Sequence, residues 1–286
     1  MRALQISLSE RGLPEARVLP WTDVIAGVTL EDVGVRECTV VKIESPGEDW
    51  DTERALLELG YDAPDSEEHL ERVHPAQLEF DTGRIHPSRQ WYLGFCGALE
   101  VIQRQLETLG RSAMNHPEDI AVMFDKRATH AKLEAVGVRV PPALGAVNDF
   151  EELVTAMRER GWHRVFVKLA HGSGAQGVIA LETNRDRWLA TSTVEMVGAA
   201  DGLRLYTARR MWRHTDLSSI RQLVNAVCRH RVHVERWLPK ASFDDKNFDL
   251  RVVVIGGHAR HVLVRARADL SRTAPRQRTR RLELRA

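Results

Sequence analysis

The segment from residue 166 to residue 181 constrains the fold of this chain more than any other part of the sequence. An apolar run that carries Lys168 leads into a loop with three glycines, and a second apolar run follows at 178–181. The glycines satisfy the Gly-x-Gly-x-x-Gly pattern of dinucleotide sites, but in those sites the loop opens a helix. Residues 178–181 lack helical spacing and are typical of a strand. We therefore predict a β-hairpin whose flexible tip can fold over phosphate groups.

The order of residues around this hairpin excludes two other phosphate-binding loops. No Gly-Lys-Ser or Gly-Lys-Thr closes the motif, as a Walker loop requires. The glycine loop of a protein kinase precedes its strand lysine, whereas here Lys168 comes first. This lysine points inward among apolar residues, and burying an unpaired ammonium is costly. We therefore expect an anion beside Lys168, although a glycine-rich hairpin can also be no more than a turn.

Composition limits the class of protein. With 286 residues, 43% of them apolar, the chain can form two compact domains. No apolar run approaches the roughly 20 residues that span a bilayer, and the N-terminus lacks the apolar region of a signal peptide. The three cysteines are far apart and odd in number, so neither a disulfide framework nor a zinc site is expected. These features predict a cytoplasmic protein with no membrane segment.

The first part of the chain alternates strand-like and helix-like segments. Residues 16–21 and 38–43 are predicted as strands, and residues 52–59 as a helix that stops at Gly60. Strands and helices in alternation predict a small α/β domain over residues 1–114.

The middle of the chain is predicted to be helical. Residues 62–83 are polar and contain prolines, so we expect a long surface connection there. A helix is predicted over 91–109. Residues 115–117 have the pattern of a helix start, and one helix is expected to run on through 121–136 to Gly137.

Four segments follow one another in an order typical of a known superfamily. They are residues 115–145, which begin with Asn-His-Pro and contain Pro-Pro at 141–142, the lysine–glycine hairpin at 166–181, Val-His-Val-Glu-Arg-Trp-Leu-Pro at 232–239 and Phe-Asp-Leu-Arg-Val-Val-Val-Ile-Gly-Gly at 248–257. Over roughly residues 115–265 they resemble the ATP-grasp superfamily, and in particular carboxylate–amine ligases of the glutathione synthetase and ribosomal-protein-modifying types.

The resemblance implies an α/β (α+β) ATP-grasp fold preceded by a small Rossmann-like domain. It divides the chain into residues 1–114, an incomplete ATP-grasp domain at 115–265 and an arginine-rich tail at 266–286, expected to be disordered.

The resemblance also implies roles for individual residues. Two lysines would contact the nucleotide phosphates, the loop residues would cover them, one glutamate would accept from the adenine amine, and two backbone positions would bond the ring. A strand arginine would act on phosphate or on the acceptor substrate, as the catalytic candidate. The ATP-binding candidates are Lys126, Lys168, Gly172, Ser173, Gly174, Gly177, Glu235, Trp237, Leu238 and Asp249, and the catalytic candidate is Arg251.

Each of these positions also has a simpler interpretation. Lys126 is a solvated surface lysine in one alternative, and Glu235 is a charged edge-strand residue facing water in another. Asp249 and Arg251 are two apart on a predicted strand, so they share a face and can pair with each other. His171 at the entrance of the loop can touch a phosphate or be incidental. The histidines as a group show no metal-ligand spacing.

The activity implied by the family is ATP-dependent ligation of a carboxylate substrate to an amine or thiol through an acyl phosphate. Phosphoryl transfer of this kind needs Mg²⁺, which binds carboxylate oxygens. The usual ligands are a late-strand aspartate and a Glu-x-Asn segment, and neither follows Asp249 here. No metal ligand is therefore assigned. We expect this chain, truncated or frameshifted at its end and also short at its N-terminus, to be inactive as a ligase.

Three alternatives to a ligase remain open. A nucleotide-binding protein without catalysis and an ATP-grasp-type kinase fit the same motifs. A nucleic-acid binder is suggested by the tail, since residues 260–286 contain nine arginines against two acidic residues, while the whole chain has a formal charge of only +1. The tail lacks interleaved aromatics and a folded reading module, so specific recognition of nucleic acid is not expected.

Overall fold

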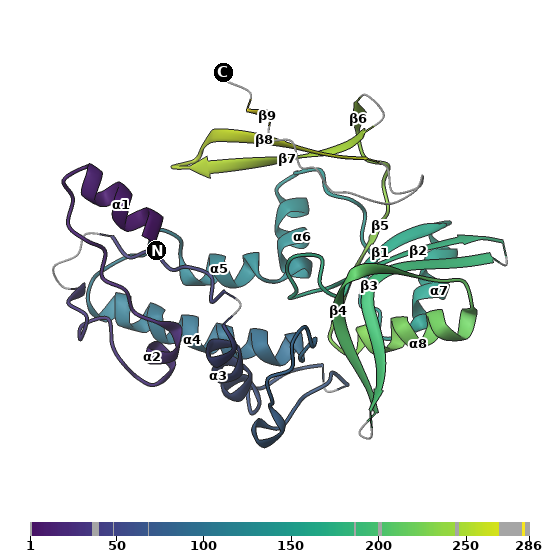
Figure 1. The fold of residues 1–286 in the computed structure, drawn as a ribbon, viewed down its shortest axis with the longest axis horizontal. Helices are drawn as coiled ribbons and strands as arrows, with labels where there is room; N and C mark the ends of the chain where they lie inside the picture. The colour runs from purple at the N-terminus through teal and green to yellow at the C-terminus, as the bar shows by residue number, and fades with distance from the viewer. Residues whose placement is uncertain are drawn as a thin grey trace. The chain divides into compact units, whose positions relative to one another are not determined.

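A computed structural model describes residues 2–35, 40–47, 49–67, 69–185, 187–199, 202–243, 246–268 and 282–283. The chain divides into two compact units, residues 1–236 and residues 237–286. In the first unit, the N-terminal half is helical and the rest combines three helices with a sheet (Figure 1). Its elements are α1 (Arg2–Glu10), α2 (Trp21–Ile25), α3 (Trp50–Gly60), a 3-10 turn (Pro75–Gln77), α4 (Ser88–Thr108), α5 (Pro117–Met123), α6 (Lys126–Ala135), α7 (Phe150–Glu159), β1 (Arg164–Leu169), β2 (Ile179–Asn184), β3 (Arg187–Ala199), β4 (Gly202–His214), α8 (Leu217–Cys228) and β5 (Val232–Arg236).

The sheet of the first unit has the strand order β4-β3-β2-β1-β5, and every neighbouring pair is antiparallel. β1 and β2 form the hairpin predicted from the glycine-rich segment, with Val167 opposite Ile179 at the loop end. This prediction is confirmed. Helices with antiparallel sheets place the chain in the mixed α and β class.

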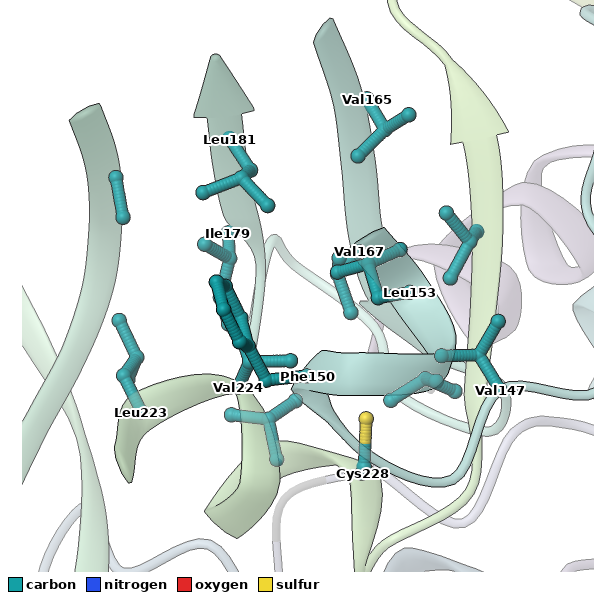
Figure 2. Close-up of a cluster of buried hydrophobic side chains, with 14 of the residues drawn as sticks. Val147, Phe150, Leu153, Val165, Val167, Ile179, Leu181, Leu223, Val224 and Cys228 are labelled. Atoms are coloured by element: carbon teal, nitrogen blue, oxygen red, sulfur yellow. The ribbon is translucent and has the colours of Figure 1, made fainter. Parts of the chain in front are cut away.

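The main core lies between this sheet and two helices. Val165, Val167 and Leu169 alternate along β1 and point to one face, where they are almost fully buried. α7 and α8 cover that face, and Figure 2 shows Phe150 and Leu153 from α7, and Leu223 and Val224 from α8, packed against the strand residues. Each helix begins at an aspartate whose carboxylate accepts from a backbone N–H of the first turn.

The N-terminal half is built around the crossing of α3 and α4. At the crossing, Gly60 and Gly94 face one another so closely that a Cβ on Gly94 would lie 1.9 Å from the carbonyl oxygen of Leu56, and one on Gly60 would lie 1.9 Å from that of Gln90. The absence of a Cβ at these two glycines lets the backbones of α3 and α4 come into direct contact, which no other residue type would allow. The predicted helices 52–59 and 91–109 are therefore confirmed, within a few residues at their ends.

The two strands predicted in this half are wrong for the residues that the structure describes. Residues 16–20 are irregular and Trp21 begins α2, while residues 40–43 contribute only an isolated parallel bridge from Val41 to Ala113. Residues 38 and 39 lie outside the described residues. Apolar side chains of these segments pack in a cluster that contains Ile102 and Leu106 of α4. The alternation of apolar and polar residues here therefore reflects burial against a helix and not pairing with another strand. No strand longer than this bridge is described before residue 114, in contrast to the Rossmann-like domain expected there.

The single helix predicted to run through 121–136 is two helices, α5 and α6. α5 ends at Met123, and Asp125 begins α6 by accepting hydrogen bonds from the N–H groups of Arg127 and Ala128. Phe124 between them packs against Phe95 with ring centroids 4.7 Å apart. An aspartate that caps a helix competes with helix continuation, and this is the physical reason for the break. The start at Pro117 is confirmed, with His116 at the N-cap.

The connection predicted at 62–83 is irregular apart from the 3-10 turn, and it docks on the sheet. Its end pairs with the edge strand β4, since the N–H of Ile85 donates to Leu205 and the N–H of Thr207 donates to Gly83. His86 and His230 are buried in the same region, at 7% and 2% exposed, and close enough for their charges to interact. Both ring nitrogens of His86 and Nδ1 of His230 are buried without a hydrogen-bond partner among the described residues.

The second unit is a small antiparallel sheet with the order β6-β7-β8-β9. Leu250, Val252, Val254 and Ile255 on its longest hairpin are all more than 40% exposed. Most of the predicted tail 266–286 lies outside the described residues, and within the described ranges no helix is long and apolar enough to cross a membrane. The strands are β6 (Ser242–Phe243), β7 (Lys246–Ile255), β8 (His258–Ala268) and β9 (Leu282–Glu283).

Candidate functional site

The loop between β1 and β2 needs glycine at specific positions. Gly174 and Gly177 have φ angles of +58° and +64°, the left-handed region that glycine adopts without steric cost. Gly177 is also buried, and a Cβ there would lie 2.4 Å from Cγ of Leu169. Gly172 is crowded by the same leucine, at 3.0 Å from its Cβ. Ser173 lies at the exposed tip, where its carbonyl accepts from the N–H of Gln176.

Lys168 lies on the opposite face of β1 from the core, so its description as an inward lysine is wrong. Strand alternation sends Val167 and Leu169 to α7 and α8 and leaves Lys168 half-buried on the other face, with 26% of its side chain exposed. There its ammonium forms an ion pair with Glu235 on the neighbouring strand β5. We expected an anion beside Lys168, and in the structure that anion is the carboxylate of Glu235.

Lys126 is held against the same loop from the first turn of α6. Its ammonium donates to the carbonyl of Gly172, and its backbone N–H donates to the carbonyl of Ala170 over 2.9 Å. Burial, reinforced by the nearby charge of Lys168, lowers the pKa of Lys126 to about 8. Lys126 is therefore no solvated surface lysine, and the two lysines predicted to hold phosphate lie close enough to repel one another.

Glu235 is surrounded by donors. Burial alone would raise its pKa, but the interactions with His233 and with the ammonium of Lys168 outweigh burial and lower the pKa to about 2. The simpler interpretation of an edge-strand acid facing water is also wrong. Residues 142–144 run along the free edge of β5, where Leu144 donates to Val234 and Arg236 donates to Pro142.

Sequence reasoning missed His233, which is opposite Lys168 in the β1–β5 register. Its Nε2 lies 3.6 Å from a carboxylate oxygen of Glu235, and its ring is 5.3 Å from that of His130 on α6. The sequence did contain a signal for His233: it is two residues from Glu235 on a predicted strand, so both side chains lie on the same face, which is also the face of Lys168.

A second group of charges, also missed, holds the start of α6 in place. Arg231 donates to Asp125 over 2.8 Å and to Glu67 over 2.6 Å, and it has a φ of +62°. His171 lies inside this group, stacked on Tyr92 with centroids 3.9 Å apart. Because burial strongly lowers the pKa of His171, the ring is neutral and packed, which argues against the phosphate contact considered for it.

The remaining predicted residues belong to the second unit and are described within it. Leu238 is exposed and Trp237 is half-buried. Asp249 and Arg251 lie on β7 as expected, but Asp249 pairs with Arg265 on β8 and lies 3.6 Å from Lys240, rather than pairing with Arg251. The first unit alone therefore brings together Lys126, Lys168, Glu235 and the glycine loop.

The described residues do not offer a magnesium site. No three His, Cys, Asp or Glu side chains within the described ranges come together in a way that could hold a metal ion. Glu235, the carboxylate paired with Lys168, also lies 3.6 Å from His233. The described residues therefore identify no ligand set for Mg²⁺.

No protein-family model matches the chain, and no curated protein matches it.

Proposed function

We propose that this chain binds ATP, with the β1–β2 loop and the lysine pair holding the phosphates. The observation that carries the proposal is the convergence of Lys126 and Lys168, from a helix and a strand, beside a glycine loop. The charge of Lys168 adds to burial in lowering the pKa of Lys126 even though Glu235 is already paired with Lys168, so a further anion beside the two ammonium groups would be favourable. A polyphosphate, with several negative charges and many acceptor oxygens, suits such a pair.

Following the ATP-grasp resemblance, we assign the exocyclic amine of the base to Glu235. The carboxylate is half-buried and ionised, so it can accept from an exocyclic amine. The family activity implied by the resemblance, activation of a carboxylate substrate as an acyl phosphate, is not part of this proposal, because the Mg²⁺ ligands of the family do not follow Asp249 in the sequence.

The proposal is tested by isothermal titration of ATP and of adenosine into the wild-type chain and two variants. Lys168→Ala and Lys126→Ala each remove one charged hydrogen bond to phosphate, worth roughly 1.5–3 kcal/mol, so ATP affinity should fall about 10-fold or more. Adenosine affinity should not fall. Lys132→Ala is the matched control, because Lys132 lies on the same helix but is exposed and paired with Asp119 over 2.7 Å.

Two results would contradict this proposal. Failure of the wild-type chain to bind ATP removes it outright. Unchanged ATP affinity in Lys168→Ala would show that the glycine hairpin is a structural turn.

A further inference from the structure

Both lysines of the proposed phosphate site are occupied by groups of the chain itself. Lys168 is paired with one carboxylate oxygen of Glu235, and the other oxygen faces His233 at 3.6 Å. Lys126 donates to the carbonyl of Gly172 at the base of the loop. In this state the ammonium groups of Lys126 and Lys168 are not free to bind phosphate, and the carboxylate of Glu235 is not free to accept from an amine.

We propose that the Lys168–Glu235 ion pair couples the two halves of the nucleotide, so that base and polyphosphate bind cooperatively; this inference rests on the proposed function. The two partners of the pair have opposite tasks. Glu235 can accept only from a donor, such as an exocyclic amine, and Lys168 can donate only to an acceptor, such as a phosphate oxygen. One bond within the protein therefore competes with both halves of the ligand.

The coupling arises because each half of the nucleotide, when it binds alone, leaves one residue of the ion pair without its partner. A polyphosphate that draws Lys168 away leaves Glu235 as a half-buried carboxylate without its ion-pair partner, 3.6 Å from His233, and an unpaired buried charge is costly. A nucleoside that takes Glu235 weakens the hold on Lys168 in the same way. When both are bound, the pair is broken once and both partners are satisfied, so the presence of either half favours the other.

The same arrangement selects the base. Adenine presents an amine at the position where guanine and hypoxanthine present a carbonyl. A carbonyl oxygen facing Glu235 would place two acceptors against one another, and it would leave the ion pair without a replacement donor. Nucleotides with a 6-carbonyl purine should therefore bind through their phosphates alone and show no coupling.

The test uses adenosine and inorganic tripolyphosphate as separate probes, titrated into the full chain in EDTA at constant ionic strength. Adenosine affinity should rise by about 5-fold or more when tripolyphosphate is saturating, and by linkage the reverse titration should give the same factor. Inosine in place of adenosine should show no such rise. This measurement needs no variant, so it does not depend on whether a mutated chain folds.

Glu235→Gln provides the second arm. Without the carboxylate, tripolyphosphate alone should bind more tightly than to wild type, and the coupling with adenosine should disappear. Asp119→Asn is the matched control, since it removes the carboxylate from an exposed ion pair between Asp119 on α5 and Lys132 on α6. It should leave both affinities unchanged.

The outcomes separate this inference from the proposal beneath it. If ATP binds and Lys168→Ala weakens it, but adenosine and tripolyphosphate bind independently, the proposed function stands and the coupling is wrong. Tighter tripolyphosphate binding by Glu235→Gln together with a coupling factor above 5 supports both. If the wild-type chain binds neither ATP nor tripolyphosphate, both fail.

Discussion

The two buried histidines between the N-terminal half and the sheet should make this protein unstable in mild acid. His86 packs against Trp50, with ring centroids 5.2 Å apart, and burial lowers its pKa from 6.5 to about 4, assisted by the charge of Arg84 and opposed by Asp81. Burial also lowers the pKa of His230 to about 4, with smaller effects from Arg229 and Arg84. In the unfolded chain both rings take up protons as the pH falls through 6.5, whereas in the folded chain they do so only near pH 4.

The magnitude follows from this difference. Between pH 6.5 and 4 the unfolded state binds more protons than the folded state, so the free energy of unfolding falls as the pH falls. At pH 5 a shift of this size costs about 2 kcal/mol for each ring, or about 4 kcal/mol for both. That is a large share of the 5–15 kcal/mol typical of a domain. Carboxylates with lowered pKa values, such as Glu235, lose their contribution only below about pH 4.5.

The assay is urea unfolding followed by circular dichroism at pH 8, 6.5 and 5. The variant His86→Leu keeps an apolar side chain against Trp50 and removes two unpartnered nitrogens, so it should lose about 2 kcal/mol less than wild type between pH 8 and pH 5. His163→Gln, at an exposed position, should lose as much as wild type. An equal loss in His86→Leu and wild type would refute the reasoning, because the protons would then enter elsewhere.

Two further predictions concern glycines. Gly177→Ala should lower the melting temperature by several degrees more than Gly174→Ala, because both residues have a positive φ but only at position 177 does the new methyl group overlap Leu169; equal shifts would show that the loop adjusts freely. At the α3–α4 crossing, Gly94→Ala should cost about 3 kcal/mol in chemical unfolding. Gly97→Ala on the same helix, where the methyl group would meet Leu59 at 3.7 Å, should be neutral or stabilising by up to about 1 kcal/mol, and a neutral Gly94→Ala would contradict the close crossing.

The elements that the sequence predicted correctly are those with a strong local pattern. The hairpin at 166–181 follows from two apolar runs around a glycine loop, and α4 follows from apolar residues at helical spacing. Residues 16–21 have apolar side chains as well, but these pack on α4, and a short run cannot reveal whether its partner is a strand or a helix. The break at Asp125 was readable, since aspartate at an N-cap is a common helix start.

The residues of the candidate site also divide into those with a local sequence pattern, which were predicted, and those without one, which were missed. Lys168 and the loop glycines were predicted from the order of residues in the hairpin, and Lys126 from the ATP-grasp resemblance. Simple alternation would have put Lys168 on the face opposite the core. His233 and Arg231 were missed because their importance depends on which strands pair and on contacts across the chain. Arg231 meets Glu67 from a segment 164 positions away, and a single sequence does not encode that proximity in any local pattern.

The group formed by Glu67, Arg231 and Asp125 ties the proposed nucleotide site to the N-terminal half. Asp125 both starts the helix that carries Lys126 and accepts from Arg231, whose other partner is Glu67. A fragment that begins at residue 115 would retain every predicted phosphate contact but leave Arg231 with one acid instead of two. The N-terminal half therefore supports the helix that carries Lys126, and loss of the Glu67 contact would weaken the hold on that lysine and, with it, the proposed phosphate site.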